Sequence, residues 1–186
     1  MRFAHPVPGR RLPQTLDRMG LPSWHDLSRA FDDAGDTARA VHVLESAVSE
    51  GHMGALVVLA RLKWKHGAFN DAVKFMKQAE RKVEADDWET HFDMHIAYSI
   101  GIGSDDGSAT KRLAFQHLLT AADASGDSRM KLSVGLHYWH GLNEVEPNLD
   151  LADRWLSEAA ASGIPDIVKD YERFLKAKHK PRKRAT

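Results

Sequence analysis

A nine-residue phrase recurs along this chain and constrains its fold more than any other feature. Residues 118–126 read LLTAADASG and residues 155–163 read WLSEAAASG, with bulky apolar residues first, alanines in the middle and a glycine at the end. Residues 43–51 (VLESAVSEG) repeat the outline, and residues 75–83 (FMKQAERKV) form a weaker copy that ends in valine. The ends of the four copies are 32, 43 and 37 residues apart, as in solenoids of helical hairpins. Each phrase therefore predicts the second helix of a hairpin.

The small residues of the phrase each have a predicted structural role. An alanine in the middle lets a neighbouring helix approach closely, while the bulky residue four positions earlier fills the space beside it. The closing glycine suits the position just after a helix, where the backbone φ is positive. The alanines are Ala47, Ala79, Ala122 and Ala159, and the glycines are Gly51, Gly126 and Gly163.

A second pattern precedes the phrase and predicts the first helix of each hairpin. Residues 94–101 (MHIAYSIG) and 134–141 (VGLHYWHG) place a tyrosine four positions, and a glycine seven positions, after an apolar residue. Residues 27–34 and 59–66 are looser copies. Positions i, i+4 and i+7 lie on one face of a helix, so the apolar residue and the tyrosine are expected to be buried together.

The two patterns predict an all-α fold, a right-handed α-solenoid of about four and a half helical hairpins with polar elements at its ends. We expect an irregular N-terminal segment (1–22), a helical-repeat solenoid domain (23–178) and a basic, disordered C-terminal tail (179–186). The expected helices cover residues 23–34, 36–50, 53–66, 69–83, 88–101, 108–125, 128–141, 149–162 and 165–178.

The patterns resemble the Sel-one-like repeat (SLR), a relative of the tetratricopeptide repeat. The outline of that family is an apolar residue with Gly-x-x-Tyr-x-x-Gly, then a short loop and Trp-x-x-Lys-Ala-Ala-x-x-Gly. The closest copy in this chain consists of Val134, Gly135, Tyr138, Gly141, Trp155, Ala159, Ala160 and Gly163. In the earlier units Lys63 replaces the tyrosine and Val83 the closing glycine, so these units are closer to ordinary tetratricopeptide hairpins. The resemblance implies an adaptor that assembles protein complexes rather than an enzyme.

Composition excludes several other classes of protein. A hydrophobic content of 42% with 28% charged residues is typical of a folded soluble domain and excludes wholesale disorder. The absence of cysteine excludes a disulfide framework and thiolate metal sites. The N-terminus lacks the apolar stretch of a signal peptide, and no window approaches eighteen apolar residues. We therefore expect a cytoplasmic protein.

The first helices of a solenoid usually line its concave side, which offers a groove to a peptide or protein. Positions two before, and two or five after, the buried apolar residue of a first helix rotate away from the buried stripe. We count these positions from Leu27, Leu59, Met94 and Val134. The resulting groove candidates are His25, Arg29, Asp32, Val57, Arg61, Trp64, Phe92, Ile96, Ser99, Leu132, Leu136 and Trp139.

A subset of these candidates is predicted to contact a protein partner. Trp64 and Trp139 occupy equivalent places in two units, and aromatic anchors dominate many interfaces. The alternative is that both tryptophans pack between adjacent hairpins. Trp155, in contrast, is expected to be structural. The predicted contact residues are Arg29, Val57, Arg61, Trp64, Phe92, Ile96, Leu132, Leu136 and Trp139.

The histidines give only a weak indication of chemistry. His91 and His95 are one helical turn apart, a spacing that can hold a metal, and His137 and His140 bracket Tyr138 and Trp139. Neither pair has an obvious third ligand, and the HExxH pattern is absent. No serine lies in a G-x-S-x-G elbow. We expect no catalytic residue, no metal site and no cofactor.

The basic C-terminal tail supports a second hypothesis. Residues 1–172 contain nineteen basic and twenty-six acidic side chains, whereas the stretch from Arg173 onward has seven Lys or Arg and no acid. A nucleic-acid-associated protein would contact phosphates with such a tail. A flexible solubilising tail, or docking on the acidic body of a second copy, explains it as well. The candidate phosphate contacts are Lys178, Lys180, Arg182, Lys183 and Arg184.

The leading expectation is a non-catalytic, bacterial interaction module that binds a protein or peptide along its concave face. A specialised version is a dedicated inhibitor of one protein, as an immunity protein is for a toxin. The sequence leaves open the identity of the partner and the oligomeric state.

Overall fold

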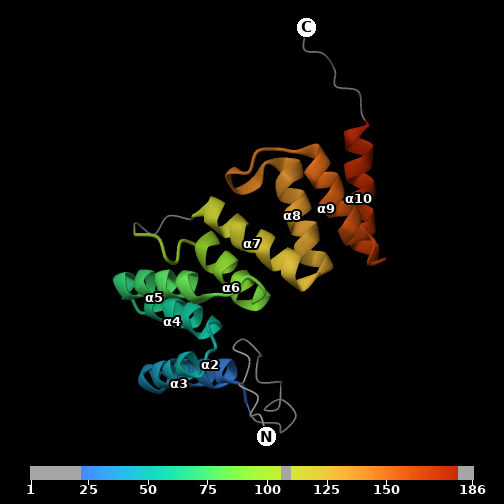
Figure 1. Cartoon of the computed structure of the whole chain (residues 1–186). Coiled ribbons are helices and arrows are strands. Elements are labelled where there is room, and N and C mark those ends of the chain that lie inside the picture. The colour runs from blue at the N-terminus through green and yellow to red at the C-terminus, as the bar shows by residue number, and fades with distance from the viewer. Residues whose placement is uncertain (1–21, 106–109, 180–186) are drawn as a thin grey trace, which may run out of the picture. The chain divides into compact units, whose positions relative to one another are not determined.

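The computed structural model describes residues 22–105 and 110–179. Over these two stretches the chain forms nine α-helices and one short 3-10 helix, with no strand (Figure 1). The helices are α2 (Trp24–Asp33), α3 (Thr37–Ser49), α4 (Gly54–Lys65), α5 (Phe69–Lys82), α6 (Trp88–Ser99), α7 (Lys111–Ser125), α8 (Ser128–His140), η1 (Leu142–Glu144), α9 (Leu149–Ala160) and α10 (Pro165–Lys178). The predicted all-α class is confirmed. The predicted bounds agree within two residues except at the start of α7, which begins at Lys111 rather than at residue 108.

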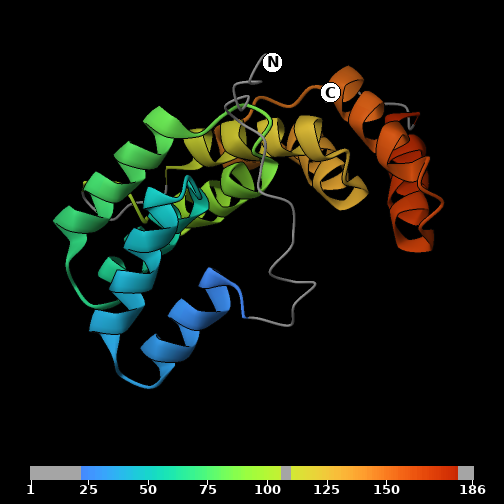
Figure 2. The same ribbon diagram turned by 60° about the horizontal axis from the view of Figure 1, so that its bottom comes forward.

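The chain divides into two compact units, residues 1–51 and 52–186. In the first unit α2 packs against α3. The second unit contains three helical hairpins, α4–α5, α6–α7 and α8–α9, and α10 packs against both α8 and α9 (Figures 1 and 2). In this unit α4 also packs against α6, and α7 against α8, so that successive hairpins are stacked. The domain bounds expected from the sequence stay a prediction.

The alanines of the repeated phrase are buried between helices, as predicted. Ala47, Ala79, Ala122 and Ala159 are all inaccessible or nearly so. Of the bulky residues four positions earlier, Leu118 and Trp155 are buried, and Val43 and Phe75 are half-buried. Trp155, predicted to be structural, lies in a core with Phe115, Leu118, Met130 and Val134. The reference positions Leu59, Met94 and Val134 of the first helices are also buried.

Polar and glycine residues set the ends of the helices. Asp127 accepts hydrogen bonds from the backbone N–H of Arg129 and Met130 at the start of α8, and aspartates Asp36 and Asp87 cap α3 and α6 in a similar way. Gly126 follows α7 with φ 68°, the left-handed conformation predicted for the closing glycine. Val83, which replaces that glycine after α5, is extended instead, with φ −66° and ψ 131°.

A glycine allows the closest helix contact of the last full hairpin. A Cβ atom on Gly135 of α8 would lie 2.6 Å from Cγ and 2.7 Å from Cδ2 of Leu156 in α9. Real Cβ atoms are never this close to another side chain, so α8 and α9 pack at this distance only because residue 135 has no side chain. The apolar-Gly pair of the repeat pattern, Val134 and Gly135, is therefore a packing feature.

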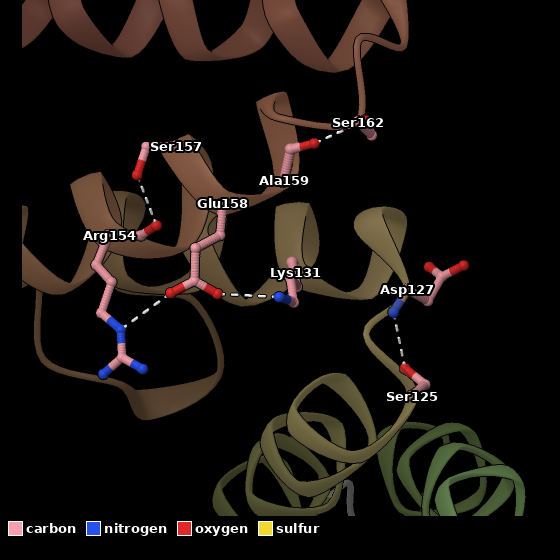
Figure 3. A network of polar contacts seen from close by, with 8 residues as sticks. All are labelled: Ser125, Asp127, Lys131, Arg154, Ser157, Glu158, Ala159 and Ser162. Atoms are coloured by element: carbon pink, nitrogen blue, oxygen red, sulfur yellow. Dashed lines mark hydrogen bonds and ion pairs between the residues drawn. The ribbon is translucent and has the colours of Figure 1, made fainter.

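Ion pairs connect the helices of this C-terminal part of the second unit. Figure 3 shows Glu158 of α9 between two cations, with Oε2 3.0 Å from Lys131 Nζ of α8 and Oε1 3.1 Å from Arg154 Nε. From α10, Lys178 Nζ lies 2.7 Å from Oδ2 of Asp153, whose other oxygen accepts the Tyr171 hydroxyl at 3.0 Å. The exposed charged residues of α10 are Asp166, Lys169, Glu172, Arg173 and Lys176.

We predict that Gly135→Ala lowers the free energy of unfolding by about 2 kcal/mol, because the new methyl group overlaps Leu156. Urea unfolding followed by circular dichroism measures the change. In a Leu156→Ala background the same substitution should cost much less, since the two closest atoms are gone and only the backbone nitrogen of residue 156, 3.2 Å from the new Cβ, still crowds it. Equal losses in the two backgrounds would show that the contact with Leu156 is not the cause.

Candidate functional site

The predicted contact residues differ widely in exposure. Arg29, Arg61 and Ile96 are exposed, and Arg29 lies in the first unit, where its Nη2 is 3.6 Å from Oδ1 of Asp26. The remaining residues are half-buried or buried. The half-buried ones are Trp64, Phe92, Leu132, Leu136 and Trp139. The predicted groove is therefore not one continuous exposed surface.

The prediction that Val57 faces a groove is wrong, because its side chain is completely buried. The residues on either side of it, Leu56 and Val58, are also buried or half-buried. α4 packs against both α5 and α6, so its apolar residues are covered on more than one side. The rotation away from Leu59 consequently exposes Arg61, two residues later, but not Val57, two residues earlier.

Three predicted contact residues of α8 pack within the chain instead. Leu132, Leu136 and Trp139 lie against the core formed by Ala152, Leu156 and Phe174. The ring of Trp139 is 5.4 Å from that of Phe174 in α10, in an edge-to-face arrangement. For Trp139 the alternative interpretation, packing between adjacent hairpins, therefore holds. α10 supplies the side chain that covers it.

The other aromatic candidates also have partners within the second unit. Phe92 of α6 packs against the core that contains Phe115 and Trp155. Trp64, at the end of α4, contacts the ring of Phe69 edge-to-face at 4.8 Å. Phe69 is itself 52% exposed, so this aromatic pair is partly accessible at the turn between α4 and α5.

An exposed apolar pair stands out at the C-terminal end of α6, where Ile100 is the residue that follows the helix. Ile96 is 36% exposed and Ile100, one helical turn later, is 61% exposed. Arg61 occupies the position of α4 that corresponds to Ile96 in the repeat, and α4 packs against α6. We call Arg61, Ile96 and Ile100 the α4–α6 face. Ile100 was missed by the groove pattern, because it is six residues after Met94 rather than five.

A buried histidine pair joins α6 to α7. Nδ1 of His91 lies 2.8 Å from Nδ1 of His117, and the two side chains belong to residues only 7% and 8% exposed. Nε2 of His117 lies 4.0 Å from Oε1 of Glu80 in α5, and the ring of Tyr98 stacks on that of His117 at 5.6 Å. Among the described residues, neither Nε2 atom of the pair has a hydrogen-bond partner.

Burial and mutual charge control the protonation of these groups. Burial lowers the pKa of His91, and the charge of a protonated His117 lowers it further. The neighbouring His117 lowers the pKa of the Glu80 carboxyl group. Burial also raises the pKa of the Tyr98 hydroxyl, which stays protonated beside Glu80. Burial therefore opposes a charge on His91, while the interaction with His117 keeps the neighbouring Glu80 carboxylate charged.

The spacing of His91 and His95 does not bring their rings to one common ligand. His91 bonds to His117, while Nδ1 of His95 lies 2.9 Å from the carbonyl oxygen of Ala114. His137 bonds through Nδ1 to the carbonyl of Ser133 and through Nε2 to Asn143. Within residues 22–105 and 110–179, no group of three or more His, Cys, Asp or Glu side chains is arranged to hold a metal ion.

The candidate phosphate-binding residues lie mostly outside the described part of the chain, which ends at His179. These are Lys180, Arg182, Lys183 and Arg184. Lys178 is described, and it pairs with Asp153 at 2.7 Å and with Asp150 at 3.8 Å. The interaction raises the pKa of Lys178 and lowers that of Asp153. Lys178 thus connects α10 to α9. In the described stretches, no helix has the length and apolar character needed to cross a membrane.

Comparison with known proteins identifies the fold. No protein-family model and no curated protein matches the chain. A solved structure is similar: the crystal structure of a Sel1 repeat protein from Oxalobacter formigenes, with a TM-score of 0.51 and 17% sequence identity. The alignment covers 84% of this chain and 64% of that protein, so this chain spans less than two thirds of its length. The chain has a Sel1-like helical repeat fold, as the sequence resemblance predicts.

We predict that Trp139→Ala lowers the free energy of unfolding by about 3 kcal/mol, because it leaves a cavity between α8 and α10. Trp64→Ala should cost about 1 kcal/mol, since Trp64 contacts a ring that is already half exposed. Urea unfolding at neutral pH compares the two variants. A larger loss for Trp64 than for Trp139 would contradict the assignment of Trp139 as the more structural residue.

Proposed function

We propose that the chain is a non-catalytic scaffold that binds a protein or peptide through the α4–α6 face. The observation that carries this proposal is the exposure of Ile96, in the last turn of α6, and of Ile100, the residue that follows the helix. Burying a branched aliphatic side chain fully contributes about 2 kcal/mol, and two such residues at one helix end are suited to a partner surface. Stacked helical hairpins commonly present binding surfaces of this kind.

The chemistry of the face indicates what kind of partner it binds. Ile96 and Ile100 require an apolar surface, and the guanidinium of Arg61, on the adjacent helix α4, favours a carboxylate beside it. A peptide or protein with aliphatic or aromatic residues next to an acidic one satisfies both. The proposal includes the specialised case in which this partner is a single protein that the scaffold inhibits, as an immunity protein does.

Contact through this face is tested by a pull-down of the partner from nuclease-treated native lysate. We expect Ile96→Asp/Ile100→Asp to lose a protein that the wild type retains, and to raise its Kd at least about tenfold once it is purified. Both side chains are exposed, so the folded state should change in stability by less than about 1 kcal/mol.

Leu142→Asp/Leu149→Asp is the matched control, because these two leucines are exposed to similar degrees in η1 and α9 of the same unit. This variant should retain the partner. If both double variants release the same protein, or neither does, the α4–α6 face is not the binding surface. Thermal unfolding of each variant shows that any loss of binding is not a loss of the fold.

The alternative function, association with nucleic acid through the basic tail, is supported by the cluster of Lys and Arg near the C-terminus. A truncation that tests it must end at His179, because Lys178 pairs with Asp153 and its removal would disturb α10.

Deletion of residues 180–186 should abolish binding to a duplex oligonucleotide if the tail anchors nucleic acid. Binding by the full chain should then fall steeply as salt is raised. Measurement of oligonucleotide binding by fluorescence anisotropy at two salt concentrations distinguishes this function from protein binding. Partner retention that survives both the deletion and added salt would exclude the tail as the main binding site.

A further inference from the structure

The His91–His117 pair brings together groups from three helices of the second unit. His91 belongs to α6, His117 to α7, and the carboxylate of Glu80 reaches His117 from α5. Tyr98 of α6 stacks on the ring of His117. The pair therefore lies where the α6–α7 hairpin meets the preceding helix, in the middle of the stack.

The geometry of the pair fixes how many protons it can hold. Two Nδ1 atoms 2.8 Å apart share one hydrogen, so one ring donates through Nδ1 and the other accepts. The neutral pair carries two ring protons, one on each imidazole. A third can be added, because a protonated ring still donates its Nδ1 hydrogen to the neutral ring. A fourth would place N–H groups of two cations against each other, and the contact would then be lost.

The surroundings oppose a charge on both rings at once. Both residues are buried, and a charge on either ring has little access to water. Glu80 can balance one positive charge on His117, whereas the backbone of Glu84 and the carboxylate of Asp87 favour a charge on His91. Burial and His117 outweigh these two groups, so the pKa of His91 is lowered.

Other ionisable groups of the packed helices mostly oppose a second charge. From α6, a charge on His95 and one on His117 oppose each other, and the charge of His117 contributes to the lowered pKa of His95. α4, which packs against α6, carries only cations in its second half. Lys77 of α5 acts on Glu80. The cations of α4 are Arg61, Lys63 and Lys65.

We propose that the His91–His117 pair makes the α6–α7 hairpin a pH-sensitive joint, which opens when both rings are protonated. Opened rings take up protons near pH 6.5, whereas burial lowers the pKa of His91 in the closed pair. The stability that the closed contact contributes is complete above pH 6.5 and is lost as the pH falls below it, because the contact cannot hold two cations. Acidification therefore loosens α6 from α7 before it affects the packing of α9 and α10.

Amide hydrogen exchange of the full chain at pH 7.5 and pH 5.5, corrected for intrinsic rates, tests the joint. The equilibrium constant for opening, measured on peptides from α6 and α7, should rise at least about tenfold. This is the effect expected if the open state binds one more proton than the closed state over the pH unit below 6.5. Peptides from α9 and α10 should change by less than about threefold. An equal change in both regions, or none in α6 and α7, would overturn the proposal.

Substitution of each ring assigns the effect to the pair. In His91→Gln the selective rise in α6 and α7 should fall below about threefold, because no second ring then opposes a charge on His117 beside Glu80. In His117→Gln the rise should fall only in part, because burial still lowers the pKa of His91. His42→Gln, at an exposed position of α3 in the first unit, is the matched control and should leave the rise unchanged. A rise that persists in both pair variants assigns the effect to another group and overturns the proposal.

Nitrogen-15 NMR of the wild-type histidine rings decides the question if the pair variants do not fold. A pair that carries at most one ring charge below pH 6.5 until the α6–α7 amides begin to exchange supports the joint. Two rings that both become protonated while those amides stay protected contradict it.

Discussion

Close contact between paired helices, made possible by small residues, is the constraint on which the rest of the structure depends. Ala79, Ala122 and Ala159 are inaccessible, and Gly135 accepts Leu156 where no Cβ atom would fit. A two-helix hairpin has apolar residues on more sides than its own two helices can cover. Stacking of the next hairpin covers the remaining sides. This stacking also brings Glu80 of α5 to the histidines of α6 and α7.

The elements that depend on local periodicity were predictable from the sequence. Helix bounds, the buried alanines and the buried Trp155 each follow from the spacing of residues within one helix or one turn. Exposure in the first helices was less predictable, because rotation away from one buried stripe implies exposure only for a helix with one covered face. α4 and α8 have neighbours on several sides, so Val57 is buried and Trp139 lies under α10.

The histidine pair depends on the register between two helices and not on a motif. The helices α6 and α7 run antiparallel, so residue numbers rise along α7 as they fall along α6. The backbone N–H of Thr110 donates to Tyr98, His95 bonds to Ala114, and His91 meets His117, each contact one step further from the connecting loop. The hairpin that the repeat predicts is sufficient, in principle, to work out this register. His117 was overlooked because its partner is far away in the sequence.

The charged outer side of α10 has an evolutionary consequence. α10 covers Trp139 with Phe174 on one side and presents exposed acids and bases on the other. A hairpin added beyond α10 by gene duplication would have to bury those charges, which is costly. A hairpin inserted between two hairpins that precede α10 would pack on the apolar surfaces that stacked hairpins already share. Within the described array, gain or loss of a hairpin is therefore expected between stacked hairpins rather than against the charged side of α10.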